Sequence, residues 1–201
     1  MGITLAGFVI QNVLTVWVNQ GGILVEYLAL GTSQLVSGKV WSLLTYSLLG
    51  VGFFQVLFNI LIIFFTGRML EPAIGHKNIL WCYLFSIFFG GIVWTIVHIQ
   101  GGYLIGATSG ALGLLALYCL LQPDQPITLL LFFVIPVTIR PKWILWIALG
   151  FATFGFLFVE LPNLSKPVMG AADYSAQLGG ILGAYIFLKT IFYLHYLVLQ
   201  I

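Results

Sequence analysis

The chain has 201 residues, of which 61% are hydrophobic and only 6% are charged, and its formal net charge is +2 at pH 7. Soluble domains carry about a quarter charged residues, so this composition excludes an ordinary soluble fold. We expect a single all-α, multi-pass membrane domain over residues 1–201, embedded in the lipid bilayer. The charge is small and dispersed, and we expect no nucleic-acid partner.

Six apolar segments approach or exceed the roughly 20 residues that cross a bilayer core. They cover about residues 3–18, 51–66, 79–98, 103–121, 143–159 and 177–198. The first lacks a basic leader and a small-residue cleavage site, so we interpret it as a retained span. Ile127–Ile139 is also apolar, but Pro136 interrupts it, and we expect an interfacial or extended stretch there.

The basic residues predict the orientation, because Lys and Arg are enriched on the cytoplasmic side of membrane proteins. Six spans place five of them on the side of both termini: Arg68, Lys77, Arg140, Lys142 and Lys189. Only Lys39 and Lys166 fall on the other side. We therefore expect both termini in the cytoplasm. The connection between Val18 and Leu49 would lie outside the cell, and its aromatic residues favour short helices at the headgroup level.

The stretch Gly106–Gly113 (GATSGALG) opens the fourth apolar segment with small residues and two hydroxyls. One interpretation is close helix packing, in which small residues let backbones approach and hydroxyls bond to carbonyls one turn earlier. The other is a serine nucleophile held within the membrane. The stretch by itself leaves both open.

Four further motifs occur around this stretch in a fixed order. They are Val40–Thr45 (VWSLLT), Gln55–Asn59 (QVLFN), Gly67–Gly75 (GRMLEPAIG) and Ser175–Gly183 (SAQLGGILG). Together with the serine-bearing fourth segment, they resemble the rhomboid family of intramembrane serine proteases. The resemblance runs from about Trp41 to Ala184 and implies a six-helix bundle with an interfacial outer loop between helices one and two.

The resemblance also implies a serine on helix four, a histidine base on helix six, and an Asn and a His on helix two that stabilise the oxyanion. Here Asn59 is kept, Gln55 stands at the position of the second-helix His, and Gln177 stands at the position of the base. A carboxamide has no titratable nitrogen, so Gln177 cannot accept the serine proton as a neutral imidazole does. Loss of the base typically costs four to six orders of magnitude in rate.

The nucleophile position is ambiguous as well. Counting back from Gly110 places it on Ser109, whereas counting back from Gly113 places it on Thr108. The two positions differ by about 100° around the helix. We interpret the centre as that of a pseudoprotease, with Ser109 a vestigial nucleophile and Thr108 the alternative position.

Several other residues have expected roles in packing rather than chemistry. Gln55 and Asn59 share one helix face, and we expect them to tie helix two to helices four and six through hydrogen bonds. Gly179 and Gly183 are expected to meet Gly110 and Gly113 at a close crossing of helices four and six.

The charged residues and histidines outside the motifs have local expectations. A local ion pair or a backbone cap is expected for Arg68 and Glu71. His98 could replace the base but is more simply a helix-end anchor, and His76 and His195 lie on the side opposite the dyad. Asp173 and Glu160 flank the loop before helix six, and the sequence does not choose a role for them. We expect no metal and no other cofactor.

The leading functional hypothesis is a non-catalytic protein that binds transmembrane helices of client or partner membrane proteins, alone or as a subunit of a membrane complex. The alternative is an active intramembrane serine endopeptidase that uses Ser109 with Gln177 at a non-standard or mutated base position. We expect an integral membrane protein of a bacterial inner membrane.

Overall fold

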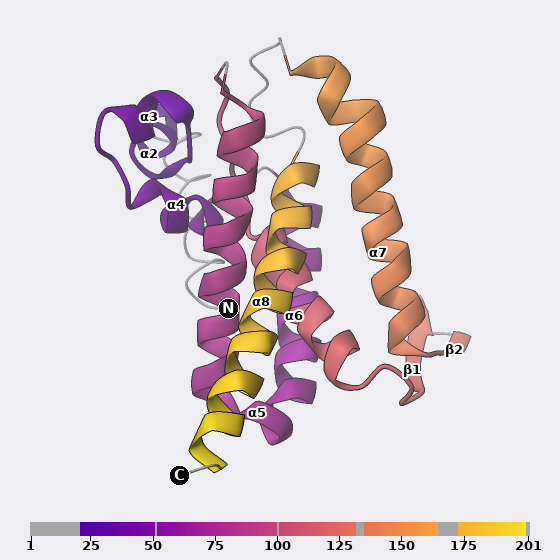
Figure 1. Cartoon of the computed structure of the whole chain (residues 1–201). Coiled ribbons are helices and arrows are strands. Elements are labelled where there is room, and N and C mark those ends of the chain that lie inside the picture. The colour runs from indigo at the N-terminus through magenta and orange to yellow at the C-terminus, as the bar shows by residue number, and fades with distance from the viewer. Residues whose placement is uncertain (1–20, 51, 100, 132–134, 165–172, 200–201) are drawn as a thin grey trace.

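A computed structural model describes residues 21–50, 52–99, 101–131, 135–164 and 173–199. The chain is predominantly helical, as predicted. Its helices are α2 (Gly21–Leu28), α3 (Thr32–Val36), α4 (Ser42–Thr45), η1 (Tyr46–Leu48), α5 (Phe53–Val97), α6 (Thr108–Leu121), α7 (Pro141–Gly155), η2 (Phe156–Glu160), η3 (Leu161–Asn163) and α8 (Tyr174–Leu199). Figure 1 shows α5, α6 and α8 packed side by side, α7 beside them and the short helices at one end.

α5 contains the predicted second and third apolar segments as two antiparallel arms joined at Gly75. Gly75 has φ 74° and ψ 161°, a conformation that side chains with a Cβ disfavour, so glycine permits the reversal here. Pro72 lies in the last turn before it, where the first arm is already ending. One arm thus runs from Phe53 toward the Gly75 turn and the other returns to Val97 (Figure 1).

Two stretches of the described residues are long and apolar enough to cross a membrane: Phe53–Val97 and Pro141–Asn163. α6 is a shorter apolar helix of 14 residues. Because Phe53–Val97 contains two arms, it accounts for two of the predicted segments. The predicted segment 3–18 lies outside the described residues, and the count of six spans stays a prediction.

The fourth helix begins five residues later than the sequence predicted. Residues 103–107 are not helical, because Leu104 pairs in extended form with Leu30, with N–O distances of 2.7 and 3.1 Å. Gly106, with φ 130°, then turns the chain into α6. This pairing fixes the short helices of residues 21–48 against the entrance to α6.

The predicted short helices between residues 18 and 49 are present in the described part of that connection. They hold one another through side chains bonded to backbone carbonyls. Gln34 donates to Glu26 O at 2.5 Å, and Thr45 donates to Leu28 O at 2.9 Å. Figure 1 shows them gathered beside the Val97 end of α5.

The apolar core lies between α5, α6 and α8, and small residues make it tight. A Cβ on Gly179 would lie 2.8 Å from Phe89 O, and one on Gly183 would lie 3.0 Å from Phe85 O. The expectation that these glycines meet helix four is therefore wrong, because they face the second arm of α5. It is Gly180, one residue further round the helix, that meets the Ser109 backbone of α6.

The extended stretch predicted before the fifth helix is a β-hairpin. Its strands β1 (Ile127–Leu131) and β2 (Ile135–Ile139) pair antiparallel, with Ile127 opposite Ile139. α7 begins directly after it, with Pro141 at the first helical position, where a missing N–H costs no hydrogen bond. The hairpin lies at the same end of the bundle as the start of α7 (Figure 1).

Candidate functional site

Thr108, the first residue of α6, is the centre of a polar group formed with the first arm of α5. Gln55 Nε2 and Asn59 Nδ2 both donate to Thr108 Oγ1, each at 3.3 Å. Gln55 and Asn59 are one turn apart on α5, so both amides reach the same oxygen. Gly106 keeps this approach open, since a Cβ there would lie 3.1 Å from Gln55 Nε2. The expected hydrogen bonds between helices two and four are present.

Asp173, immediately before α8, completes the group from the side of helix six. Its Oδ1 accepts a hydrogen bond from Gln177 Nε2 at 2.8 Å, and its carboxylate interacts electrostatically with the nearby Thr108 hydroxyl. The Gln177 backbone N–H also donates to Asp173 O at 2.9 Å. Sequence reasoning left Asp173 without a role. The available signal was its spacing of four residues from Gln177, which places the two side chains on one face.

Ser109 lies outside this group, on the opposite side of the start of α6. Its Oγ is 2.7 Å from the Tyr46 hydroxyl, which also donates to Ile87 O at 2.8 Å. Ser109 is buried, with Gly90 and Gly180 packed against its side chain and backbone. No described hydrogen bond joins Ser109 to Gln55, Asn59 or Gln177. The structure therefore brings Thr108, not Ser109, to the Gln55 and Asn59 side chains of helix two.

The space beside the polar group is small. A cavity of about 10 Å³ lies between the first arm of α5 and the residues entering α6, with Gln55, Asn59 and Gly106 among its lining. That volume corresponds to about one water molecule.

A second buried polar group fixes the start of α8 and the end of α7. Glu160 is fully buried; its Oε2 accepts the Ser175 backbone N–H at 2.7 Å, and its Oε1 accepts the Ser175 hydroxyl. A carboxylate at a helix N-terminus meets unpaired N–H groups and the positive end of the helix dipole. Glu160 therefore anchors the first turn of α8, which begins at Tyr174, the residue after Asp173.

His98 also lies at this second group and not at Thr108. Its Nδ1 is 3.5 Å from Glu160 Oε1 and 3.3 Å from Trp94 O, and its ring stacks on Trp94. These contacts agree with a helix-end anchor. His76 lies at the opposite end, 3.2 Å from Glu71, and the side chain of His195 lies outside the described residues.

Within the described residues, no three His, Cys, Asp or Glu side chains gather at metal-binding distance. The two cysteines, Cys82 and Cys119, are free and buried in the core around α5 and α6. What the site offers chemically is therefore a hydroxyl, three carboxamides as donors, and one carboxylate that already accepts a hydrogen bond from Gln177.

The motifs predicted a helical membrane bundle in which the fourth helix begins with a hydroxyl residue beside the amides of the second helix. The structure has this arrangement at Thr108, Gln55 and Asn59. The rhomboid domain model matches residues 37–194 of this chain. The chain belongs to the rhomboid family, as the sequence predicted, and is an integral membrane protein. No match was found among curated proteins.

Proposed function

We propose that this protein is a non-catalytic member of the rhomboid family that binds transmembrane helices of other membrane proteins, alone or as a subunit of a membrane complex. The observation that supports it is the hydrogen bonding of Thr108. Its hydroxyl oxygen accepts hydrogen bonds from Gln55 and Asn59, and the neighbouring Asp173 carboxylate accepts one from Gln177. The hydroxyl and the amides that would contact a substrate in a protease are thus hydrogen-bonded to one another.

The absence of an imidazole supports the same conclusion. Gln177 occupies the position of the family's base, and its amide donates to Asp173, so it offers the Ser109 hydroxyl no proton acceptor. Ser109 instead bonds to Tyr46, a phenol that does not act as a base near neutral pH. A hydroxyl without an adjacent base remains a weak nucleophile.

One observation favours a second candidate, a hydrolase that uses Thr108 as nucleophile and Asp173 as base. The Asp173 carboxylate lies close enough to this hydroxyl to interact with it electrostatically, and a nucleophile needs such a proton acceptor nearby. Against it, Gln55 and Asn59 donate to the nucleophilic oxygen itself, whereas oxyanion donors act on the oxygen of the substrate carbonyl.

Labelling with a fluorophosphonate probe separates these functions. We expect the purified protein to remain unlabelled and a generic transmembrane substrate to stay intact over a long incubation, in the parent and in Gln177→His. Labelling that disappears in Thr108→Ala but persists in Ser109→Ala would establish the second candidate. Labelling that disappears in Ser109→Ala would establish a serine protease.

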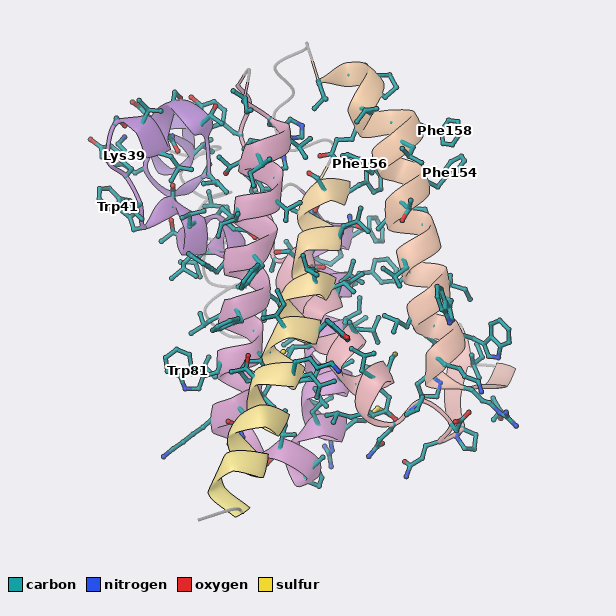
Figure 2. All side chains as sticks on the ribbon, viewed as in Figure 1. Lys39, Trp41, Trp81, Phe154, Phe156 and Phe158 are labelled. Atoms are coloured by element: carbon teal, nitrogen blue, oxygen red, sulfur yellow. The ribbon has the colours of Figure 1, made fainter. Side chains whose placement is uncertain are left out.

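Binding of helices is tested by photo-crosslinking in native membranes. A crosslinking residue replaces Phe158, beyond the end of α7, or Phe65 on the first arm of α5; both side chains are more than half exposed. Figure 2 shows Phe158 pointing away from the bundle. We expect adducts with other membrane proteins whose crosslinked peptides lie within transmembrane segments. Adducts with lipid alone at both positions would contradict the proposal.

A further inference from the structure

An open surface hollow lies between the two arms of α5 beside the Gly75 turn, far from the Thr108 group. Its volume is about 380 Å³, within the range of small-molecule sites in proteins. Ile63 and Phe64 on the first arm and Ile79 on the second line its apolar part. Gly67 leaves the wall open, since a Cβ there would meet no atom within 4 Å. No described side chain fills this space.

The polar part of the hollow carries an arginine without an acidic partner. The sequence predicted a local ion pair or a backbone cap for Arg68 and Glu71. Glu71 instead lies 3.2 Å from His76, because the Gly75 turn brings His76 back beside it. All five acidic residues of the chain are described, and none lies within ion-pair distance of Arg68. The expected pair is therefore absent, and the exposed Arg68 guanidinium is available to an external anion.

The chemistry of the hollow defines its ligand. A guanidinium presents a planar pair of donors that matches phosphate oxygens, and Lys77 adds a second positive charge at the same turn. Directly beside Arg68, the exposed rings of Phe64 and Phe65 offer an apolar surface. A ligand that satisfies both parts carries a phosphate at one end and hydrocarbon at the other.

We propose that the hollow at the Gly75 turn is a binding site for one anionic phospholipid. Its phosphate binds Arg68, and its acyl chains lie along Ile63, Phe64 and Ile79. Basic pockets between membrane helices bind acidic headgroups in the same manner. This site does not depend on whether Thr108 is catalytic, so a failure of the lipid proposal leaves the proposed function untouched, and the reverse also holds.

The test is a lipid titration of the full chain in detergent, read by native mass spectrometry. Phosphatidylglycerol is compared with phosphatidylcholine in the parent, Arg68→Gln and Glu71→Gln. We expect one tightly bound phosphatidylglycerol and weaker phosphatidylcholine binding in the parent. Arg68→Gln should weaken phosphatidylglycerol about tenfold, the loss typical of one charge-assisted contact. Glu71→Gln should strengthen it, because a competing negative charge is removed.

Arg140→Gln is the matched control, since Arg140 is the only other arginine and lies before α7, beside Asp124. Its affinity for phosphatidylglycerol should equal that of the parent. An equal loss in both arginine variants, or unchanged affinity in Arg68→Gln, would overturn the site. If Arg68→Gln does not fold, Glu71→Gln still decides the test. Unchanged or weaker phosphatidylglycerol binding in Glu71→Gln would also overturn the proposed site. Inorganic phosphate at millimolar concentration should not displace the lipid; complete displacement would show a site for free phosphate instead.

Discussion

At the scale of single residues, Thr108 and Ser109 show how one step along a helix separates two environments. Successive residues on an α-helix are rotated by about 100°, so adjacent hydroxyls cannot face the same neighbours. Thr108 faces Gln55, Asn59 and Asp173, whereas Ser109 faces Tyr46 and the backbones of α5 and α8. The two hydroxyls should therefore differ in what their removal costs.

Thr108→Val removes the hydroxyl but keeps the shape of the side chain. It removes the acceptor that Thr108 offers to Gln55 and Asn59, and the loss of buried hydrogen bonds of this kind costs about 1–3 kcal/mol. Ser109→Ala leaves the Tyr46 hydroxyl bonded to Ile87 O and should cost about 1 kcal/mol or less. Unfolding in a detergent series measures both. If Ser109→Ala proved the more damaging, Thr108 would not be the centre of the polar group.

At the scale of elements, small residues decide how closely α5, α6 and α8 approach. A Cβ on Gly180 would overlap the Ser109 carbonyl, and one on Gly113 would overlap the Ser86 hydroxyl. Membrane helices associate largely through such close packing, because lipid provides no hydrophobic drive between them. The glycines of α6 and α8 therefore stabilise the crossing that holds Thr108 beside Asp173.

Gly180→Ala should lower the stability of the protein by about 1–3 kcal/mol, because the added methyl must displace backbone atoms. Gly150→Ala is the matched control on α7, where a Cβ would meet nothing within 4 Å. It should be neutral or slightly stabilising, since alanine favours helices over glycine by up to about 1 kcal/mol. Thermal unfolding in detergent compares them. Equal melting of the two variants would contradict the close crossing of α6 and α8.

At the scale of the whole molecule, the two ends of the bundle differ in charge. The Gly75 turn and the entry to α7 carry Arg68, Lys77, Arg140 and Lys142, while the end formed by the short helices carries Lys39. Cytoplasmic loops of membrane proteins are enriched in Lys and Arg, so the Gly75 end is the predicted cytoplasmic end. The proposed lipid site would then face the leaflet in which anionic lipids are available.

Cysteine labelling of whole cells tests this orientation. Lys77→Cys should react with a membrane-impermeant maleimide only after permeabilisation, and Lys39→Cys should react in intact cells. The native Cys82 and Cys119 are buried and should give little background, which the parent protein measures directly. Reversed accessibility of the two positions would place the Gly75 end outside and contradict the predicted topology.

The sequence by itself determined the family, the helical membrane class and the residue types at the centre. Apolar runs, the Gly67–Gly75 turn motif and the order of the other motifs are local signals, because helix formation and bilayer insertion depend on neighbouring residues. The absence of an imidazole at position 177 is likewise a fact of the sequence alone.

Only the tertiary structure decided which residues share the site. Whether Thr108 or Ser109 faces helix two depends on where α6 begins, and the pairing of Leu30 with Leu104 moves that start to Thr108. The pairing of Glu71 with His76 depends on the reversal of the chain at Gly75. The packing of Gly179 against α5 depends on how α8 is rotated about its axis. The Leu30–Leu104 pairing and the packing of Gly179 on α5 join segments distant along the chain, and the Glu71–His76 pair depends on a reversal that helical spacing alone does not predict.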